Sequence, residues 1–530
     1  MSLIRILLSM AAASGAALAQ TNTPEIRRVS LEDCLQIAIE HNLDVQIKRY
    51  NPEIARFNLG VLYGAYDPSF YLNGEHDDIQ QPSSVDSQGR AIPGIKLTTD
   101  SYSGGLQGLL PWGLSYNLGL TLSDQTSTRP GSITTNTFFT NTFLDLNTGN
   151  NVTLVGTSFG STNAASSQET ISGSAGLLQL RQPLLKNFWI DNNRLQIFLD
   201  RKNLKISELD LRSQVITTVT TVEQAYYDLI FSQENVKVQQ KALELANRLV
   251  VENKKRVEVG ALAPLDEKQA ESQAAASKAD LLAALGTEDT QERVLKSLLS
   301  DDYSKWKNVS IQPTESMVAL PEGYNLQESW ERGLRLRPDL LQQELSLEKQ
   351  GYIVRFQKNQ LLPQLDLVGT AGLRGSSPTY NDYFGQLGGG DNPFWSVGGQ
   401  MSIPLGNTSA RNSYRAAKAG KEQIALQLKQ LQQNILIQIE NAIATARTSF
   451  QRVDATREAR IYAEAALDAE QKKLESGKST SFEVLRLQRD LTTARSAEIR
   501  ALADYNIALA QIAQNEGTTL DRRHVTLEVK

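Results

Sequence analysis

Apolar positions three and four residues apart run through two long segments of the chain and predict helices of unusual length. From about 195 to 257 no proline or glycine interrupts the chain, and 416 to 476 contains a single glycine, Gly420. A continuous helix over the first segment would be roughly 90 Å long at 1.5 Å per residue. Each segment is followed by an alanine-bearing helical stretch, over 265–299 and 482–514. The pattern predicts two long helical hairpins.

One apolar stripe in the second long segment has the spacing of a nearly straight helix. It is made of Ile424, Leu428, Leu431, Ile435, Ile439, Ala442 and Ala446. The average step lies close to an 11-residue repeat of about 3.67 residues per turn, which does not impose a left-handed supercoil. Straight helices side by side can form the wall of a cylinder, but one chain has too few helices to close it.

Other segments alternate between apolar and polar residues with a period of two and predict strands. The apolar positions are Leu114, Tyr116, Leu118, Leu120 and Leu122 in one segment, and Trp395, Val397, Gly399, Met401, Ile403 and Leu405 in another. A half-buried soluble sheet and the wall of a membrane barrel both show this alternation. The segments 78–100, 123–168 and 375–393 are rich in Ser, Thr, Asn and Gly. Long polar loops of this kind favour the outer-membrane barrel.

The chain repeats one plan twice. A shift that places Leu31 on Leu326 also aligns Pro68 with Pro363. In each copy a helical stretch, 31–66 or 326–361, is stopped by the proline and followed by strands and a long helical region. The first copy has more candidate strands than the two expected, over 70–72, 104–110, 114–122 and 171–180, with Pro111-Trp112-Gly113 as a turn. The surplus fits either an extra hairpin outside the barrel or an extension of its rim.

The first nineteen residues have the features of a secretory signal. Arg5 precedes an apolar run, and Ala17-Leu18-Ala19 supplies the small residues of a cleavage site. The run is too short for a membrane anchor, and Gln20 offers no cysteine for a lipid. No later segment resembles a spanning helix, so membrane insertion would require a closed β-barrel. Four expected strands per chain are too few for a barrel, which makes oligomerisation a requirement.

Composition argues against an enzyme and against nucleic acid as a partner. The net charge is −5, and no basic patch with interleaved aromatics is present. The three histidines, His41, His76 and His524, are far apart, and no nucleophile, phosphate or metal motif accompanies them. Asp77 and Asp78 follow His76 and could touch a cation, but a polar strand end is favoured because metal sites need three or four ligands. We therefore expect no cofactor, no metal and no catalytic residue. With Cys34 as the one cysteine, no intrachain disulfide is possible.

The duplicated order of elements resembles the TolC-like outer-membrane efflux family across nearly the whole mature chain. The opening segment Leu31-Glu32-Asp33-Cys34-Leu35-Gln36-Ile37-Ala38 with Asn42-Leu43-Asp44-Val45, and the segment Leu178 to Leu185 around Gln182-Pro183, carry the likeness. It implies a mixed α and β fold: a homotrimer with one twelve-stranded outer-membrane β-barrel, continued by a periplasmic α-helical barrel of long coiled hairpins.

The resemblance also implies a domain plan and a function. Residues 1–19 would be a signal peptide, 20–300 the first repeat, 301–325 an equatorial connector, 326–514 the second repeat and 515–530 a C-terminal tail. The subunit would form the exit duct of a tripartite efflux or type I secretion system. It would be a passive conduit in outer-membrane lipid, coupled through a periplasmic adaptor to an inner-membrane RND or ABC-type pump. The alternative is a periplasmic coiled-coil spacer or surface adhesin without transport, which the duplicated strands disfavour because a spacer needs no barrel.

The turns of both hairpins place glycine where a long helix must end, as a helix C-cap permits. The two turns are Val259, Gly260, Ala261, Leu262 and Ala263, and Ser476, Gly477, Lys478, Ser479 and Thr480. By resemblance these turns form the periplasmic tip that the adaptor grips. The simpler interpretation is two well-capped helix turns.

An acid stands six residues after each glycine, Asp266 and Glu483. In the resembled family, acids just inside the tip ring the pore's narrow entrance, where carboxylates attract cations. The rival interpretation is a solvated acid favoured near a helix N-terminus. Arg486 stands where the family often has a second acid, so a strongly anionic gate is not expected here.

Overall fold

The structure is a computed structural model that describes residues 25–85, 91–92, 94–129, 138–144, 151–157, 165–260 and 262–526. The expected signal peptide, residues 1–19, lies outside these residues. The chain divides into two compact units. The first holds residues up to Arg56, Lys202–Leu347 and the chain from Gln423 on; the second holds Phe57–Arg201 and Glu348–Glu422.

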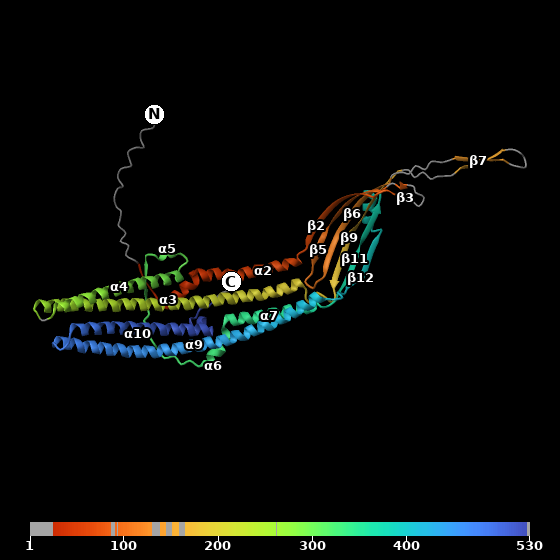
Figure 1. Ribbon diagram of the computed structural model, residues 1–530. Coiled ribbons are helices and arrows are strands. Elements are labelled where there is room, and N and C mark those ends of the chain that lie inside the picture. Colours follow the sequence, from red (N-terminus) through yellow and green to blue (C-terminus); the bar gives the residue numbers. More distant parts are fainter. Residues whose placement is uncertain are drawn as a thin grey trace, which may run out of the picture. The chain divides into compact units, whose positions relative to one another are not determined.

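The two long helical hairpins are present with the expected lengths (Figure 1). The long arms are α3 (Asn192–Glu258) and α9 (Thr408–Glu475), and the return arms are α4 (Pro264–Leu299) and α10 (Ser481–Glu516). Of the apolar stripe along α9, Ile435, Ile439, Ala442 and Ala446 are buried in one cluster with Leu340. None of the described helices has an 18-residue stretch apolar enough to cross a membrane.

The helical stretch that opens each repeat is present and is divided into two main helices. The first copy forms α1 (Leu31–His41), α2 (Leu43–Tyr63) and a short η1 (Gly64–Tyr66), and the second forms α6 (Leu326–Leu336) and α7 (Pro338–Asn359). The Asn42 side-chain oxygen accepts from the Asp44 N–H at 3.0 Å and so caps a new helix. In the second copy, Pro338 disfavours helical backbone at Arg337.

The helical unit has its largest core where α1, α3 and the end of α4 meet. Cys34, Val219, Tyr226 and Leu299 are fully buried there. The segment that links the repeats contains α5 (Tyr303–Trp306) and β10 (Val309–Pro313), and β10 pairs in parallel with β1 (Glu25–Val29). After α10 the chain forms α11 (Thr519–Arg522), and its Leu520 packs in the same core.

The second unit is built on one antiparallel sheet of six strands in the order β12-β11-β9-β6-β5-β2 (Figure 1). The strands are β2 (Ser69–Gln80), β5 (Lys96–Leu109), β6 (Ser115–Arg129), β9 (Ser166–Pro183), β11 (Gln364–Ser377) and β12 (Pro393–Ser402). β2 begins directly after Pro68 and β11 directly after Pro363, as the repeat predicted. The expectation of four strands per chain was wrong, because the surplus segments form β5 and β6 within this sheet.

The segments predicted to be long polar loops also include parts of strands. β2, β6 and β11 all extend into segments expected to be loops, and α8 (Tyr380–Gly389) lies between β11 and β12. Two short pairs, β3 (Ser84–Val85) with β4 (Ala91–Ile92) and β7 (Phe138–Leu144) with β8 (Asn151–Thr157), occupy further parts of them. Ser and Thr mark loops only weakly, since Thr is also a good strand former. At the other end, β12 stops at Ser402, so Ile403 and Leu405 lie beyond it.

Candidate functional site: two hairpin tips and a two-faced sheet

The tip between α3 and α4 turns at Gly260, which has the left-handed value φ +77°. Its N–H donates to the Val257 carbonyl at 2.9 Å and so closes the last turn of α3. A Cβ at this position would meet no atom within 4 Å, so glycine is required by the backbone and not by crowding. Val259 beside it is 78% exposed. Ala261 lies outside the described residues.

The tip between α9 and α10 repeats this geometry with a more polar sequence. Gly477 has φ +71°, and the Lys478 N–H reaches back to the Lys473 carbonyl at 2.9 Å, as in a Schellman cap. Thr480 then caps α10 by accepting from the Glu483 N–H at 3.4 Å. Across the turn, the Ser479 hydroxyl donates to Glu470 of α9.

Glu470 is the best-anchored acid of this second tip. The Ser479 hydroxyl and the Lys473 ammonium, whose nitrogen lies 2.9 Å from the carboxylate, hold the pKa of Glu470 below its ordinary value. Both contacts stabilise the ionised form, which is the direction expected for hydrogen bonds to a carboxylate. Glu470 was not predicted from the sequence, because it lies more than one helical turn before the predicted turn residues.

The three expected gate residues are each engaged with close neighbours. Asp266 accepts the Ala263 N–H at 3.2 Å and so caps its own helix α4. Glu483 and Arg486 lie 2.7 Å apart as an ion pair one turn along α10. Leu262 and Ala263 directly precede α4, whose third residue is Asp266. The acids thus serve local capping and pairing.

A buried polar link joins the two hairpins just behind the tips. Asn253 of α3 and Ser481 of α10 are 1% and 0% exposed, and the serine hydroxyl donates to the asparagine side-chain oxygen at 3.1 Å. The Asn253 amide donates to the backbone carbonyl of Asp266 in α4 at 3.2 Å. Sequence reasoning missed this link; its only signal is an asparagine near the end of a long helix.

Near Ser69, Leu109 and Ser402 the six-stranded sheet has one apolar face and one polar face, whereas toward the other end of the strands His76, Asp100 and Asp124 stand on the side of the apolar face. The apolar face carries Phe70, Leu72, Leu106, Leu118, Leu120, Leu122, Leu178, Leu180, Leu365, Leu367, Trp395, Val397 and Met401. The polar face carries Ser69, Tyr71, Asn73, Gln107, Asn117, Thr121, Gln179, Arg181, Asp366, Thr370, Ser396 and Gln400. The division runs across all six strands. It suits a wall between an apolar medium and water.

Side-chain hydrogen bonds on the polar face join β9 to its neighbour β11, two strands that are far apart in the sequence. Arg181 of β9 reaches Asp366 of β11, with its Nε 2.8 Å from the carboxylate, and Asp366 is almost fully buried. The Arg181 Nη2 also donates to this carboxylate, and Gln364 adds a third bond of 2.8 Å. These contacts satisfy a buried charge, which would otherwise be costly.

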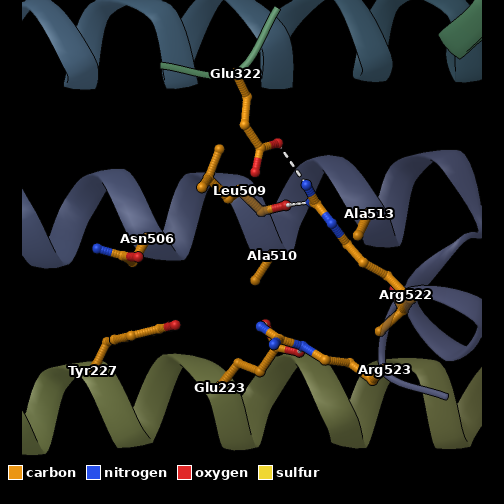
Figure 2. Close-up of a pocket in the computed structure, with 10 residues that line it drawn as sticks. Glu223, Tyr227, Glu322, Asn506, Leu509, Ala510, Ala513, Arg522 and Arg523 are labelled. Carbon is orange, nitrogen blue, oxygen red and sulfur yellow. Dashed lines mark hydrogen bonds and ion pairs between the residues drawn. The ribbon is translucent and has the colours of Figure 1, made fainter. Parts of the chain in front are cut away.

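A cavity of about 140 Å³ lies between α3, α10 and the C-terminal tail (Figure 2). Arg523 makes a two-point ion pair there with the buried Glu223 of α3, at 2.8 and 3.0 Å. Arg522 points the other way and binds Glu322 of the linking segment. The side-chain hydroxyl of Thr519 is buried in this wall without a hydrogen-bond partner. The two arginines tie the tail to both α3 and the linking segment.

No cluster suited to a metal ion occurs among the described residues: no three of His, Cys, Asp and Glu come together. Cys34 is buried, and burial raises the pKa of its thiol to about 12. It is therefore a protonated core residue at neutral pH.

Known proteins with the same plan were found by sequence and by structure. BepC of Brucella suis, an outer membrane efflux protein, is 25% identical over 344 residues, which cover 64% of this chain and 70% of that protein. The outer membrane protein TolC of Vibrio cholerae is 24% identical over 360 residues, covering 65% of this chain and 76% of that protein. The solved CmeC outer membrane channel of Campylobacter jejuni shares the fold, with a TM-score of 0.62 at 16% identity over 92% of this chain and 86% of that chain.

The family model described as "Outer membrane efflux protein" matches residues 143–300 and 331–518, one match in each repeat. The first match begins beyond β6, whereas the second begins within α6. Together the matches cover well over half of the chain, and the chain belongs to the outer membrane efflux protein family.

Proposed function

We propose that this efflux channel subunit works as a homotrimer that forms the outer-membrane exit duct of a tripartite efflux or type I secretion system. The apolar face of the sheet carries the proposal. Leu72 and Trp395, on the two edge strands, are 77% and 79% exposed in the single chain. An apolar face of this extent, with a polar face behind it, fits lipid on one side and water on the other.

The helical hairpins support the same assembly. Exposed apolar side chains remain along the α4 and α9 helices of the single chain: Leu282, Leu285 and Val294 on α4, and Leu426, Ile437, Ile461 and Tyr462 on α9. Packing α4 of one copy against α9 of the next would remove both sets from water. Such a contact is heterologous and closes into a ring when the rotation between copies allows it.

The tips are the proposed docking site for a periplasmic adaptor, which would link the duct to an inner-membrane RND or ABC-type pump. Val259 and Gly260 of one tip, and Gly477 and Lys478 of the other, are exposed at helix ends. Small and polar residues there permit the close approach of a partner's helices. The chain itself would perform no chemistry, since the pump supplies the energy.

Asp266, Glu483 and Arg486 are proposed to line the periplasmic entrance of the duct. The Glu483–Arg486 ion pair cancels much of the charge that each copy would bring. Three copies would therefore give a ring of mixed charge around the pore. Asp266, unlike Glu483, has no paired arginine among the described contacts. Such a ring would favour cations only weakly.

The first test is the native mass of the protein after detergent extraction from the outer-membrane fraction. A mass of three chains supports the duct. A monomer, or recovery from the soluble periplasm, contradicts it and favours the coiled-coil spacer.

A further inference from the structure

The sheet contains one hairpin more than the duplicated plan requires. The repeat matches β2 with β11 and β9 with β12, and β11 and β12 are direct neighbours. Between β2 and β9, however, the sheet holds β5 and β6, joined by a tight turn in which the Leu110 N–H donates to the Leu114 carbonyl at 2.8 Å. The second repeat has no counterpart of this hairpin, since nothing lies between β11 and β12 in the sheet. The extra hairpin therefore departs from the chain's own duplicated plan.

The extra hairpin is a full part of the sheet and not a flap on its surface. β6 pairs with β9 from Ser115↔Arg181 to Arg129↔Ser166, with one bulge near Gly119. Tyr71 of β2 donates to the Asn117 side-chain oxygen of β6 at 3.0 Å, passing over β5. Gly119 makes room for this bridge, because a Cβ there would lie 2.9 Å from the tyrosine oxygen.

The two edges of the sheet, β2 and β12, are suited to pair with each other in neighbouring copies. The six strands alternate in direction, so the two edge strands run antiparallel. An exposed edge is a row of unpaired N–H and C=O groups, which cannot remain open in lipid. Both edges also carry large apolar residues on the apolar face, such as Leu72 and Trp395.

We propose that β12 of one copy pairs with β2 of the next, so that three copies close an eighteen-stranded barrel in place of a twelve-stranded one. The proposal rests on the trimer proposed above. The count follows from three copies of six strands. We align the first residue of β2 with the last residue of β12, so that Ser69 lies opposite Ser402. The next pairs are Phe70 with Met401, Tyr71 with Gln400, Leu72 with Gly399, Gly74 with Val397 and Glu75 with Ser396.

This register is consistent with the side chains on both faces. Phe70, Leu72 and Met401 all belong to the apolar face, whereas a shift by one residue would place apolar against polar positions. Large and small residues alternate across the seam, since Leu72 meets Gly399 and Val397 meets Gly74. The seam would therefore pack without a clash or a large gap.

The same register gives a plausible strand tilt. Successive strand partners lead across the sheet from Phe70 through Leu106, Leu118, Leu178 and Ala371 to Trp395. The proposed partner of Phe70 is Met401, six residues further along β12. This offset of six residues accumulates over six strands, which is one residue per strand. The tangent of the tilt angle is then the rise per residue, about 3.3 Å, divided by the strand spacing, about 4.8 Å, which gives a tilt of about 35°. That value lies at the lower end of the usual range for barrels of about 35–45°.

A barrel of this size would be wider than the family's plan. Barrel diameter grows roughly in proportion to strand number, so the diameter would be about 1.5 times, and the cross-section about 2.2 times, that of twelve strands. The hairpin adds Asn117 and Thr121 to the polar face, which would line the water-filled interior. The extra width suits bulky or strongly hydrated cargo.

Paired cysteines in the membrane-embedded protein test both the strand count and the seam. Glu75→Cys with Ser396→Cys probes β2 against β12 of the next copy, and Asn117→Cys with Gln179→Cys probes β6 against β9. Directly opposed residues in an antiparallel pair lie within the Cα separation that a disulfide needs. The native Cys34 is buried and protonated, so it does not interfere. Glu75→Cys with Val397→Cys is the matched control, because these positions point to opposite faces.

We expect oxidation to give a covalent trimer for the first pair, an intrachain disulfide for the second and no link for the control. A different result would be a native trimer in which Ser69→Cys forms a disulfide with Gln179→Cys, whereas Asn117→Cys forms none with Gln179→Cys. That result would place β2 beside β9. It would overturn the eighteen-stranded barrel but not the proposed duct. A trimer with no link between β2 and β12 overturns the seam. If no trimer forms even in single-cysteine variants, the proposed duct itself fails.

Discussion

Asn253 and Ser481, 228 residues apart in the chain, form a buried hydrogen bond of 3.1 Å that joins α3 to α10 behind the tips. The same asparagine holds the Asp266 carbonyl of α4. One side chain thus connects three of the four long helices. The ends of the hairpins are tied together by a contact that excludes water.

Replacement of this asparagine should loosen the tips. In Asn253→Ala, the fully buried Ser481 hydroxyl loses its partner, which costs about 1–3 kcal/mol for an unsatisfied group, and the partly buried Asp266 carbonyl loses its side-chain donor. We expect faster hydrogen exchange over the last turns of α3 and the first turns of α10, measured by mass spectrometry on the trimer.

Asn235→Ala is the matched control for this change. Asn235 also joins α3 to α10, accepting from Ser496 at 2.7 Å, but it is only partly buried. Water can replace its lost bond, so the exchange rate should change little. Equal effects of the two variants would show that burial does not decide the cost.

The C-terminal tail should stabilise the helical unit through Arg523. In Arg523→Ala the carboxylate of Glu223, which is 2% exposed, would lose its two-point partner. Removing one member of a buried pair costs about 3–5 kcal/mol. Because Arg523 is partly exposed, we expect the free energy of unfolding to fall by about 3 kcal/mol. The variant trimer should therefore dissociate or unfold at a lower temperature.

The double variant Arg523→Gln with Glu223→Gln tests whether the loss of stability comes from the unpaired charge of Glu223 or from the loss of the Arg523 side chain itself. It removes the buried charge together with its partner, so most of the lost stability should return. If the double variant is as unstable as Arg523→Ala, the ion pair is not the reason for the loss.

The long hairpins could be predicted from the sequence because they depend on local rules. Few prolines or glycines interrupt 195–257 or 416–476, and glycine marks both turns. The breaks at Asn42 and Arg337 were missed, since the apolar spacing continues through them. Strand ends were misjudged because the strands continue beyond their apolar stretch: in β6, Thr126 and Thr128 follow on the same side as Leu122, and Ser and Thr of this kind suggested a loop. The Asn253–Ser481 and Glu223–Arg523 contacts depend on which helices pack together, and no local pattern shows that.

Bulky residues at the tip glycines should abolish export and leave the trimer in the membrane. Gly260→Leu and Gly477→Leu force a side chain onto a left-handed backbone, at a cost of about 1–2 kcal/mol each. They also fill the surface proposed to receive the adaptor. Export by intact cells, with the trimer quantified in parallel, measures the effect.

Gly286→Ala is the control for the tip glycines. Gly286 lies within α4, has open space around it and does not have a left-handed backbone. Alanine there should preserve export and slightly stabilise the helix. Normal export by the tip variants would show that the tips do not dock the adaptor.

Acid should weaken the α9–α10 tip through Glu470. The Ser479 hydroxyl and Lys473 lower the pKa of this carboxyl in the folded protein, so the contact stabilises the turn fully above the ordinary value of 4.5. That contribution is lost as the pH falls through the lowered folded pKa. Hydrogen-exchange protection at 476–480, corrected for the intrinsic pH effect, should therefore decline below about pH 4.5. In Ser479→Ala the protection at neutral pH should be smaller and should depend less on pH, because the main cause of the shift is gone. An unchanged pH profile in this variant would mean that another group controls the tip.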